Sequence, residues 1–259
     1  MAETAVTGRT RDVVIFIDRL ILGLSRHWLL IANLGFGVWV LLPWLAPLLM
    51  AAGLERGARP IYAAYSLQCH QLPQRSYFLF GPRPMVPLAD INAAWPYTDY
   101  VRLRQFVGSP ALGYKVAWSD RMVSLYTPLF FGGLLFALAR WRSATRHRAG
   151  RFNGWQPLPV RWWLLALAPL FVDGVSHAIN DATGLGFRDT NAWLAALTGN
   201  ILAPTFYAGD AVGSLNWWLR LLTGLLAGLA TAWLIYPHLD DAFRDIRETL
   251  EVRLRRVAG

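Results

Sequence analysis

The sequence predicts an all-α fold: a multi-pass integral membrane helix bundle of about four spans, with short interfacial helices and a cytoplasmic amphipathic C-terminal helix. Two observations lead to this fold class. The chain is 55% hydrophobic and only 16% charged over its 259 residues. Its apolar residues also gather in four runs long enough to cross hydrocarbon about 30 Å thick, which takes roughly 20 helical residues. A soluble all-helical protein is the alternative, and this composition lies far from the soluble average.

The four predicted spans cover residues 28–52, 122–141, 162–180 and 217–236. Aromatic residues stand at or near the span ends, as in the aromatic belts of membrane proteins. They are Trp28, Trp44, Trp141, Trp162, Trp163, Trp217, Trp218 and Tyr236. A shorter apolar run, 192–203, is too brief to cross unaided and is predicted to be a re-entrant or interfacial helix. Residues 1–26 show no small-residue cleavage site after a short apolar core, so we expect the first span to stay as an anchor.

Arginines orient the predicted bundle. The linker between the second and third spans contains no acidic residue, and its arginines are Arg140, Arg142, Arg146, Arg148, Arg151 and Arg161. With four spans, this linker lies on the same side as both termini, and the positive-inside rule places that side in the cytoplasm. We therefore expect one domain over residues 1–259 in the cell (inner) membrane, with residues 1–26 as a cytoplasmic segment.

The net charge of +9 is spread over short loops without a recognition motif, so no nucleic acid is expected as a partner. Attraction to anionic headgroups explains the charge more simply, and membrane lipids are the expected partners. The tail, residues 238–259, interleaves acids and arginines and repeats apolar residues every three or four positions. This pattern predicts an amphipathic helix that lies on the cytoplasmic face or against a partner. A solvated helical end is the alternative.

The most polar part of the first outer loop is Gln-Cys-His-Gln-Leu-Pro-Gln-Arg-Ser, residues 68–76. It holds the only cysteine of the chain, Cys69, together with His70, Gln71 and Arg75. Polar groups at the edge of a membrane are costly to dehydrate, so a cluster of them indicates a functional site. Apolar residues at helical spacing predict a helix over residues 62–77, packed at the outer boundary.

Other polar residues fall at the same outer boundary once the spans are oriented. Arg121 lies at the start of the second span, Asp173 and His177 lie near the end of the third, and Arg220 lies near the start of the fourth. This convergence of separate parts of the chain predicts one ligand-binding site. Its candidate residues are His70, Gln71, Arg75, Arg121, Asp173, His177 and Arg220.

Asp173 and His177 are four residues apart and share one helix face. Such a pair can ligate a metal, or the carboxylate can orient the imidazole as a base. In the alternative interpretation, Asp173 pairs with a neighbouring arginine and His177 forms an interfacial hydrogen bond. The chain has no recognisable zinc spacing, so we expect no metal site. Neither a catalytic residue nor a cofactor follows from the sequence.

Arg75, Arg121 and Arg220 suggest a different chemistry. Guanidinium groups match phosphate and carboxylate oxygens bidentately, so three of them could hold a lipid phosphate or another anion. Internal pairing with Asp120 and Asp173 is the alternative.

A local repeat links two outer segments. The pattern Asn-x-Trp-Leu-x-x-Leu-Thr-Gly occurs at 191–199 and again at 216–224. It predicts two similar interfacial helix starts, each with an asparagine near its first turn. Gly224 and Gly228 form a small-xxx-small pair, which is compatible with close helix packing and with a homo-oligomer.

The run Cys69-His70-Gln71-x-Pro73-x-Arg75-Ser76-Tyr77 resembles the signature of the prokaryotic membrane family called domain of unknown function 2085. The resemblance covers residues 60–235 and includes further segments: 112–117, Asp120-Arg121 with Tyr126, Asp173-Gly174, and Asn216-x-x-x-Arg220-x-x-Thr223-Gly224. It implies a small multi-pass membrane protein and brings no established activity.

The chain departs from this family at Ser119. Members commonly carry a cysteine just before the Asp-Arg pair. If that cysteine pairs with the first-motif cysteine or shares a metal with it, Cys69 of this chain has lost its counterpart.

Two functional hypotheses remain. In the first, the outer cluster is a pocket for an anionic lipid-like or small polar ligand. In the second, the protein is a non-catalytic subunit or scaffold of a membrane complex, with a membrane-protein partner or a second copy, and its polar cluster is internal. Transport is less favoured, because no span carries mid-membrane charges. A pocket with unpaired His177 and Arg220 would favour the first, and full mutual pairing without a cavity would favour the second.

Overall fold

The computed structural model describes residues 8–146 and 155–258. The middle of the 140–161 linker, residues 147–154 with Arg148 and Arg151, lies outside the described residues.

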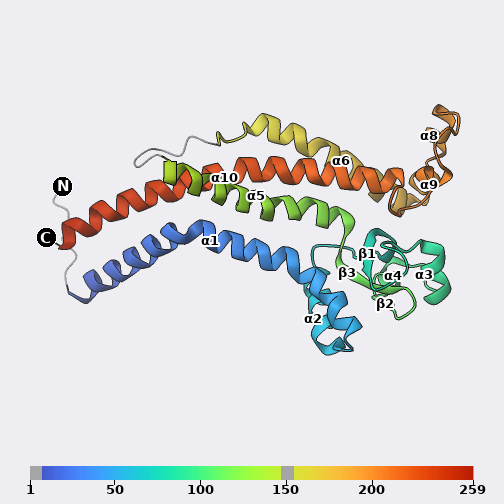
Figure 1. The fold of residues 1–259 in the computed structure, drawn as a ribbon, viewed down its shortest axis with the longest axis horizontal. Helices are drawn as coiled ribbons and strands as arrows, with labels where there is room; N and C mark the ends of the chain where they lie inside the picture. Colours follow the sequence, from blue (N-terminus) through green and yellow to red (C-terminus); the bar gives the residue numbers. More distant parts are fainter. Residues whose placement is uncertain (1–7, 147–154, 259) are drawn as a thin grey trace.

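Four long helices run side by side along the molecule (Figure 1). They are α1 (Arg9–Ala51), α5 (Asp120–Arg146), α6 (Val160–Thr183) and α10 (Leu215–Ala258). Each is long and apolar enough to cross a membrane by length and composition. The mostly helical architecture with four such helices is therefore confirmed.

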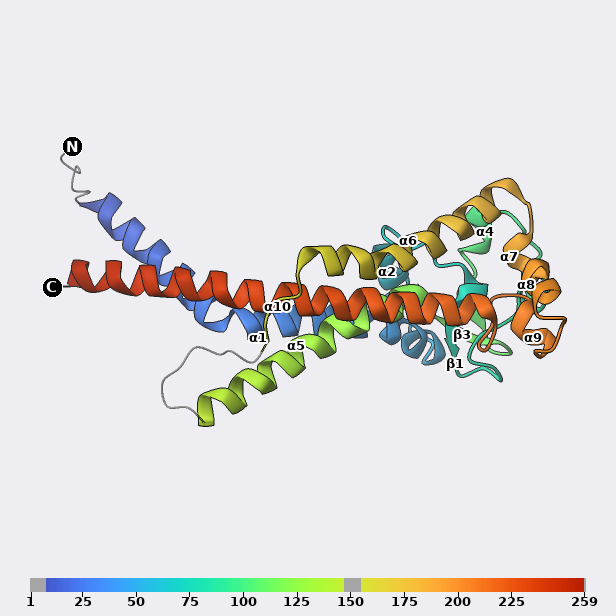
Figure 2. The same cartoon turned by 90° about the horizontal axis from the view of Figure 1, so that it is seen from above.

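Two of these helices are much longer than the predicted spans. Helix α10 continues without a break through the tail, so the tail is helical as predicted, and it forms the last part of the fourth long helix. The tail packs against the first half of α1, where Arg26 binds Glu251 at 2.8 Å and Arg253 binds Asp18 at 3.3 Å. The start of α1 and the end of α10 therefore lie at one end of the molecule (Figures 1 and 2).

The opposite end carries a small α/β unit. Its sheet was not part of the predicted all-α fold. It consists of α2 (Glu55–Tyr65), the 3-10 turn η1 (Pro73–Arg75), β1 (Ser76–Leu79), α3 (Leu88–Ala94), α4 (Tyr100–Leu103), β2 (Gly108–Ser109) and β3 (Gly113–Ser119). The strands form an antiparallel sheet in the order β1-β3-β2. Strand β3 ends at Ser119, and α5 begins at the next residue.

The predicted helix over residues 62–77 is wrong beyond Tyr65, where α2 ends. Gln71 has a positive φ of 52°, which is incompatible with a continuing helix. Pro73 lacks a backbone N–H and begins η1 instead. The backbone then pairs with β3, where Ser76 lies opposite Ser119 and Phe78 opposite Lys115.

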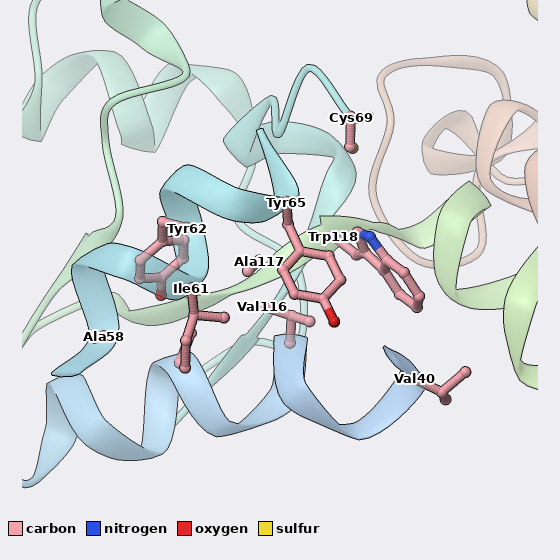
Figure 3. Close-up of a cluster of buried hydrophobic side chains, with 10 residues drawn as sticks. Val40, Ala58, Ile61, Tyr62, Tyr65, Cys69, Val116, Ala117 and Trp118 are labelled. Atoms are coloured by element: carbon pink, nitrogen blue, oxygen red, sulfur yellow. The ribbon is translucent and has the colours of Figure 1, made fainter. Parts of the chain in front are cut away.

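A buried apolar cluster joins this unit to the long helices (Figure 3). Tyr65 of α2 meets Trp118 of β3 edge-on at 5.2 Å between ring centroids, and Trp118 stacks on Tyr126 of α5 at 5.1 Å. The helical spacing of Tyr62, Tyr65 and Cys69 in the sequence thus reflects residues of one core, although only part of the segment is helical.

Lys115 is fully buried within the same unit and has no carboxylate partner among the described residues. Its Nζ donates to the carbonyl oxygens of Gln71 at 2.7 Å and Arg104 at 2.6 Å. Burial lowers the pKa of Lys115 to about 7, because the charged form loses its hydration. The two hydrogen bonds tie the loop before η1 and the end of α4 to the sheet.

Helices α5 and α10 make the closest helix contact, and glycines permit it. A Cβ on Gly228 would lie 2.3 Å from the Leu125 carbonyl oxygen, and one on Gly224 would lie 2.0 Å from Ser124 Oγ. The small-xxx-small pair of α10 is therefore buried against α5 of the same chain. It offers no surface for a second copy.

Short helices follow α6 at the same end: α7 (Phe187–Thr190), α8 (Ala192–Leu197) and α9 (Pro204–Tyr207). The apolar run 192–203 is thus helical only as far as Leu197.

Candidate functional site

A buried chain of ion pairs connects the segments where the long helices meet the α/β unit. It alternates in sign in the order Asp181, Arg75, Asp210, Arg220 and Asp120. These residues come from η1, α5, α6, α10 and the loop after α9. The interaction therefore holds five separate parts of the chain together.

Arg75 is positioned by the short turn η1. Its guanidinium group donates to both carboxylate oxygens of Asp181, at 2.7 and 3.0 Å, and its Nε donates to Asp210 at 3.1 Å. Burial alone would lower the pKa of Arg75, but Asp210 and Asp181 outweigh burial and raise it. Arg75 therefore stays charged.

Asp210 lies between two arginines. It accepts from Arg75 Nε and from an Arg220 terminal nitrogen at 2.6 Å. Burial alone would raise the pKa of Asp210, but Arg75 and Arg220 outweigh it and hold the pKa at about 2. The carboxylate is thus ionised at neutral pH.

Arg220 is almost fully buried near the start of α10, and all of its nitrogens have acceptors. Its Nε donates to both oxygens of Asp120, at 2.9 and 2.8 Å, and its other nitrogens reach the carboxylate and backbone oxygens of Asp210. Asp120 Oδ1 also accepts from the backbone N–H of Arg121 at 2.8 Å. Arg220 is therefore paired rather than free.

A second group of buried charges begins at Arg121, the residue after Asp120. Arg121 binds Asp173 at 2.5 Å, and Asp173 also accepts from Arg188 of α7. Arg188 approaches His177 Nε2 at 3.0 Å. A guanidinium group can only donate, so His177 Nε2 must be the unprotonated nitrogen of a neutral ring. This bond occupies the nitrogen that a metal or a substrate proton would need.

The predicted site residues divide into three sets. Asp173, His177 and Arg121 lie together, and Arg75 and Arg220 belong to the adjacent chain of ion pairs. Gln71 has a different role, because its side-chain amide donates to the carbonyl oxygens of Tyr62 and Ala117 at 2.9 Å each.

A cavity of about 520 Å³ opens beside the ion pairs, a size typical of small-molecule sites. Its charged and polar wall includes His70, Arg75, Asp120, Arg121, Asp181 and Arg220, and its apolar wall includes Leu72, Met122, Ala178 and Ala182. Among these groups, Arg121 retains a buried Nε–H without a hydrogen-bond partner in the described part of the chain. The cavity is thus amphipathic, and one of its lining residues has a donor without a partner in the described part of the chain.

Sequence reasoning missed Asp181, Arg188 and Asp210. Asp181 lies two helical turns after Asp173, so the face of α6 that carries Asp173 and His177 could have indicated it. Arg188 and Asp210 lie outside the long helices, in a one-turn helix and a loop, where no periodicity marks them.

The two asparagines of the local repeat meet in space. Asn191 Nδ2 and Asn216 Nδ2 both donate to the carbonyl oxygen of Arg188, at 3.2 and 2.6 Å. The repeat thus fixes the backbone of the residue that binds Asp173 and His177.

Cys69 is buried and lies beside Ser119, with 3.5 Å between Sγ and Oγ. The part of the chain that the structure describes contains no group of three or more His, Cys, Asp or Glu residues placed to hold a metal. Ser119, the position at which the sequence departs from the signature that it resembles, is the neighbour of Cys69.

Comparisons with known proteins add little to this geometry. No family model matches the chain, so the family resemblance stays a prediction. An uncharacterised protein of Methanocaldococcus jannaschii is 27% identical over 146 residues, which cover 56% of this chain and 62% of that protein. The match thus spans less than two thirds of its relative. No solved structure matches.

The first prediction concerns Asp173, which is buried between two arginines. Asp173→Asn removes the charge that compensates both guanidinium groups, and breaking such a buried pair costs about 3–5 kcal/mol. We expect a clear fall in melting temperature, measured by thermal shift in detergent. The control is Asp90→Asn, which breaks an exposed pair with Arg83 and should cost about 0–1 kcal/mol. Equal melting temperatures for the two variants would refute this role of Asp173.

The second prediction concerns the neighbour of the cysteine. Ser119→Cys places two sulfurs close together, and a disulfide needs them about 2.05 Å apart. We expect the oxidised variant to titrate no free thiol and the reduced variant two. Ser143→Cys lies about 35 Å further along α5 and should keep both thiols free. Two free thiols in the oxidised Ser119→Cys protein would contradict the 3.5 Å contact.

Proposed function

We propose that this chain is an integral membrane protein that binds an amphipathic ligand with an anionic head in its outer cavity. The four long apolar helices support membrane insertion. Both described chain ends and the end of α5 lie away from the α/β unit (Figure 1), which fits a bundle with cytoplasmic termini and an outer α/β unit.

The observation that carries the ligand proposal is the unused Nε–H of Arg121 in the wall of an amphipathic cavity. A buried cationic donor without an acceptor is costly, and an oxygen of a phosphate or carboxylate would satisfy it. The apolar wall at Met122 and Ala178 suits the first carbons of an acyl chain. His70 is exposed and lines the same cavity, where it can donate to the headgroup.

A scaffold role is the second candidate, and the mutual pairing of the charges favours it. Four arginines face four aspartates, so the cluster carries no formal excess charge. In this case the network would only hold the outer segments together, and the cavity would contain water.

The third prediction tests the orientation. Arg102 lies exposed on the α/β unit, and Arg256 lies exposed near the end of α10. A membrane-impermeant maleimide should label the Arg102→Cys variant in intact cells and the Arg256→Cys variant only after permeabilisation. The unmodified chain, with its buried Cys69, is the background control. Labelling of the Arg256→Cys variant in intact cells would overturn the orientation.

The fourth prediction tests the ligand without removing a charge. Ala178→Leu narrows the cavity, and overpacking of about 1–3 kcal/mol corresponds to binding that is roughly five- to a hundredfold weaker. We expect saturable binding of short-chain phosphatidylglycerol by the parent protein, measured by calorimetry in detergent. The affinity of the Ala178→Leu variant should be lower by this factor.

Ala64→Leu is the matched control, because Ala64 is exposed on α2 and does not line the cavity. Phosphatidylcholine of equal chain length tests the need for an anionic head, and inorganic phosphate tests the need for the acyl chain. If none of the three probes binds saturably, the pocket proposal is wrong and the scaffold role is favoured.

A further inference from the structure

Helix α1 exposes a continuous apolar stripe along its whole length. The stripe follows alternating steps of four and three residues: Val13, Ile17, Leu20, Leu24, His27, Ile31, Leu34, Val38, Leu41, Leu45 and Leu48. All of these side chains are exposed, and His27 is the one polar residue among them. We call this set the α1 seam. A strict seven-residue repeat is the pattern of a helix that packs along a second helix.

The N-terminal half of the seam is exposed at a level where contact with lipid tails does not account for its apolar side chains. Arg26 and Asp18 of α1 bind Glu251 and Arg253 in the most charged part of α10. A segment packed on such a charged helix does not fit inside hydrocarbon. Yet Val13, Ile17, Leu20 and Leu24 continue the seam at this level, each about half exposed. Such a stripe in an aqueous compartment requires a covering surface.

The residue types in the seam favour a parallel helix pair. The first core position holds Ile17, Ile31 and Val38 beside two leucines, 24 and 45 in the sequence, and the second position is mostly leucine: Leu20, Leu34, Leu41 and Leu48. β-branched residues in the first position and leucine in the second favour a two-stranded parallel coiled coil. Copies inserted in one membrane share one orientation, so a second copy presents α1 in parallel.

Electrostatics and size also fit a second copy. A two-fold axis along the seam brings each residue near its own counterpart, so a charged seam residue would face a like charge. The seam contains no Lys, Arg, Asp or Glu. Residues 13–48 form a strip about 54 Å long and about 10 Å wide. Two such strips bury about 1,000 Å², the lower bound for a specific interface.

We propose that two copies of this chain associate in parallel through the α1 seam, from Val13 to Leu48. This inference rests on the proposed membrane insertion, which gives the two copies one orientation, and is independent of any ligand. Figure 1 shows α1 at the edge of the bundle, with α5, α6 and α10 on one side of it and α2 near its end.

The fifth prediction uses the full chain in detergent, with its mass measured by light scattering. The monomer mass is 29.1 kDa, and we expect the parent protein at twice that mass. Leu20→Glu should halve it, because two carboxylates would face each other in the seam. Since Leu20 is 53% exposed in the single chain, this substitution leaves the fold intact, which an unchanged melting temperature of the monomer will verify.

The control is Arg19→Glu, one residue away but off the seam, which should leave the dimer unchanged. A second readout is Leu20→Cys, which should form an intermolecular disulfide, whereas Arg19→Cys should not. A monomeric parent protein, or a dimer that survives Leu20→Glu, would overturn the proposal. The mass measurement does not depend on phosphatidylglycerol, so a failed ligand test and a failed dimer test are distinguishable.

Discussion

The contact between Asp210 and two arginines joins the α/β unit to the start of α10. Arg75 precedes the sheet and Arg220 lies near the start of α10, so one carboxylate joins elements that are distant in the sequence. Two buried guanidinium groups would repel each other in a low-dielectric interior without a shared counter-charge. Asp120 and Asp181 then complete the compensation at the two ends of the chain of ion pairs. Because each buried charge has an opposite charge beside it, these polar residues can lie together between apolar helices.

The neutrality of the network changes how an anion can be recognised. Each nitrogen of Arg220 already has an oxygen acceptor, and both terminal nitrogens and the Nε of Arg75 contact carboxylates. A headgroup in the proposed site would therefore meet no excess of formal positive charge from the network. Its recognition would rest on single donors such as Arg121 Nε and the ring of His70. Sites of this kind select by the placement of hydrogen bonds more than by charge.

The sequence predicted those features that periodicity and composition record. Apolar length located the four long helices, and the face of α6 that carries Asp173 and His177 proved to be buried among charges. Pairing of arginines with Asp120 and Asp173 was one of the two alternatives. The sheet was missed because its strands are short, and because core residues of α2 and the following turn repeat at helical spacing. Asp210 escaped notice because a loop residue reveals its partners only through the fold.

The direct passage from β3 into α5 has a mechanical consequence. Between Ser119 and Asp120 there is no loop to absorb a bend, and Asp120 is clamped by Arg220 immediately past the junction. The α/β unit and α5 are therefore connected rigidly at this junction. A displacement of the sheet would therefore be passed directly to the start of α5, because no loop between them can absorb it. The close contact of α5 with Gly224 and Gly228 would carry it on to α10.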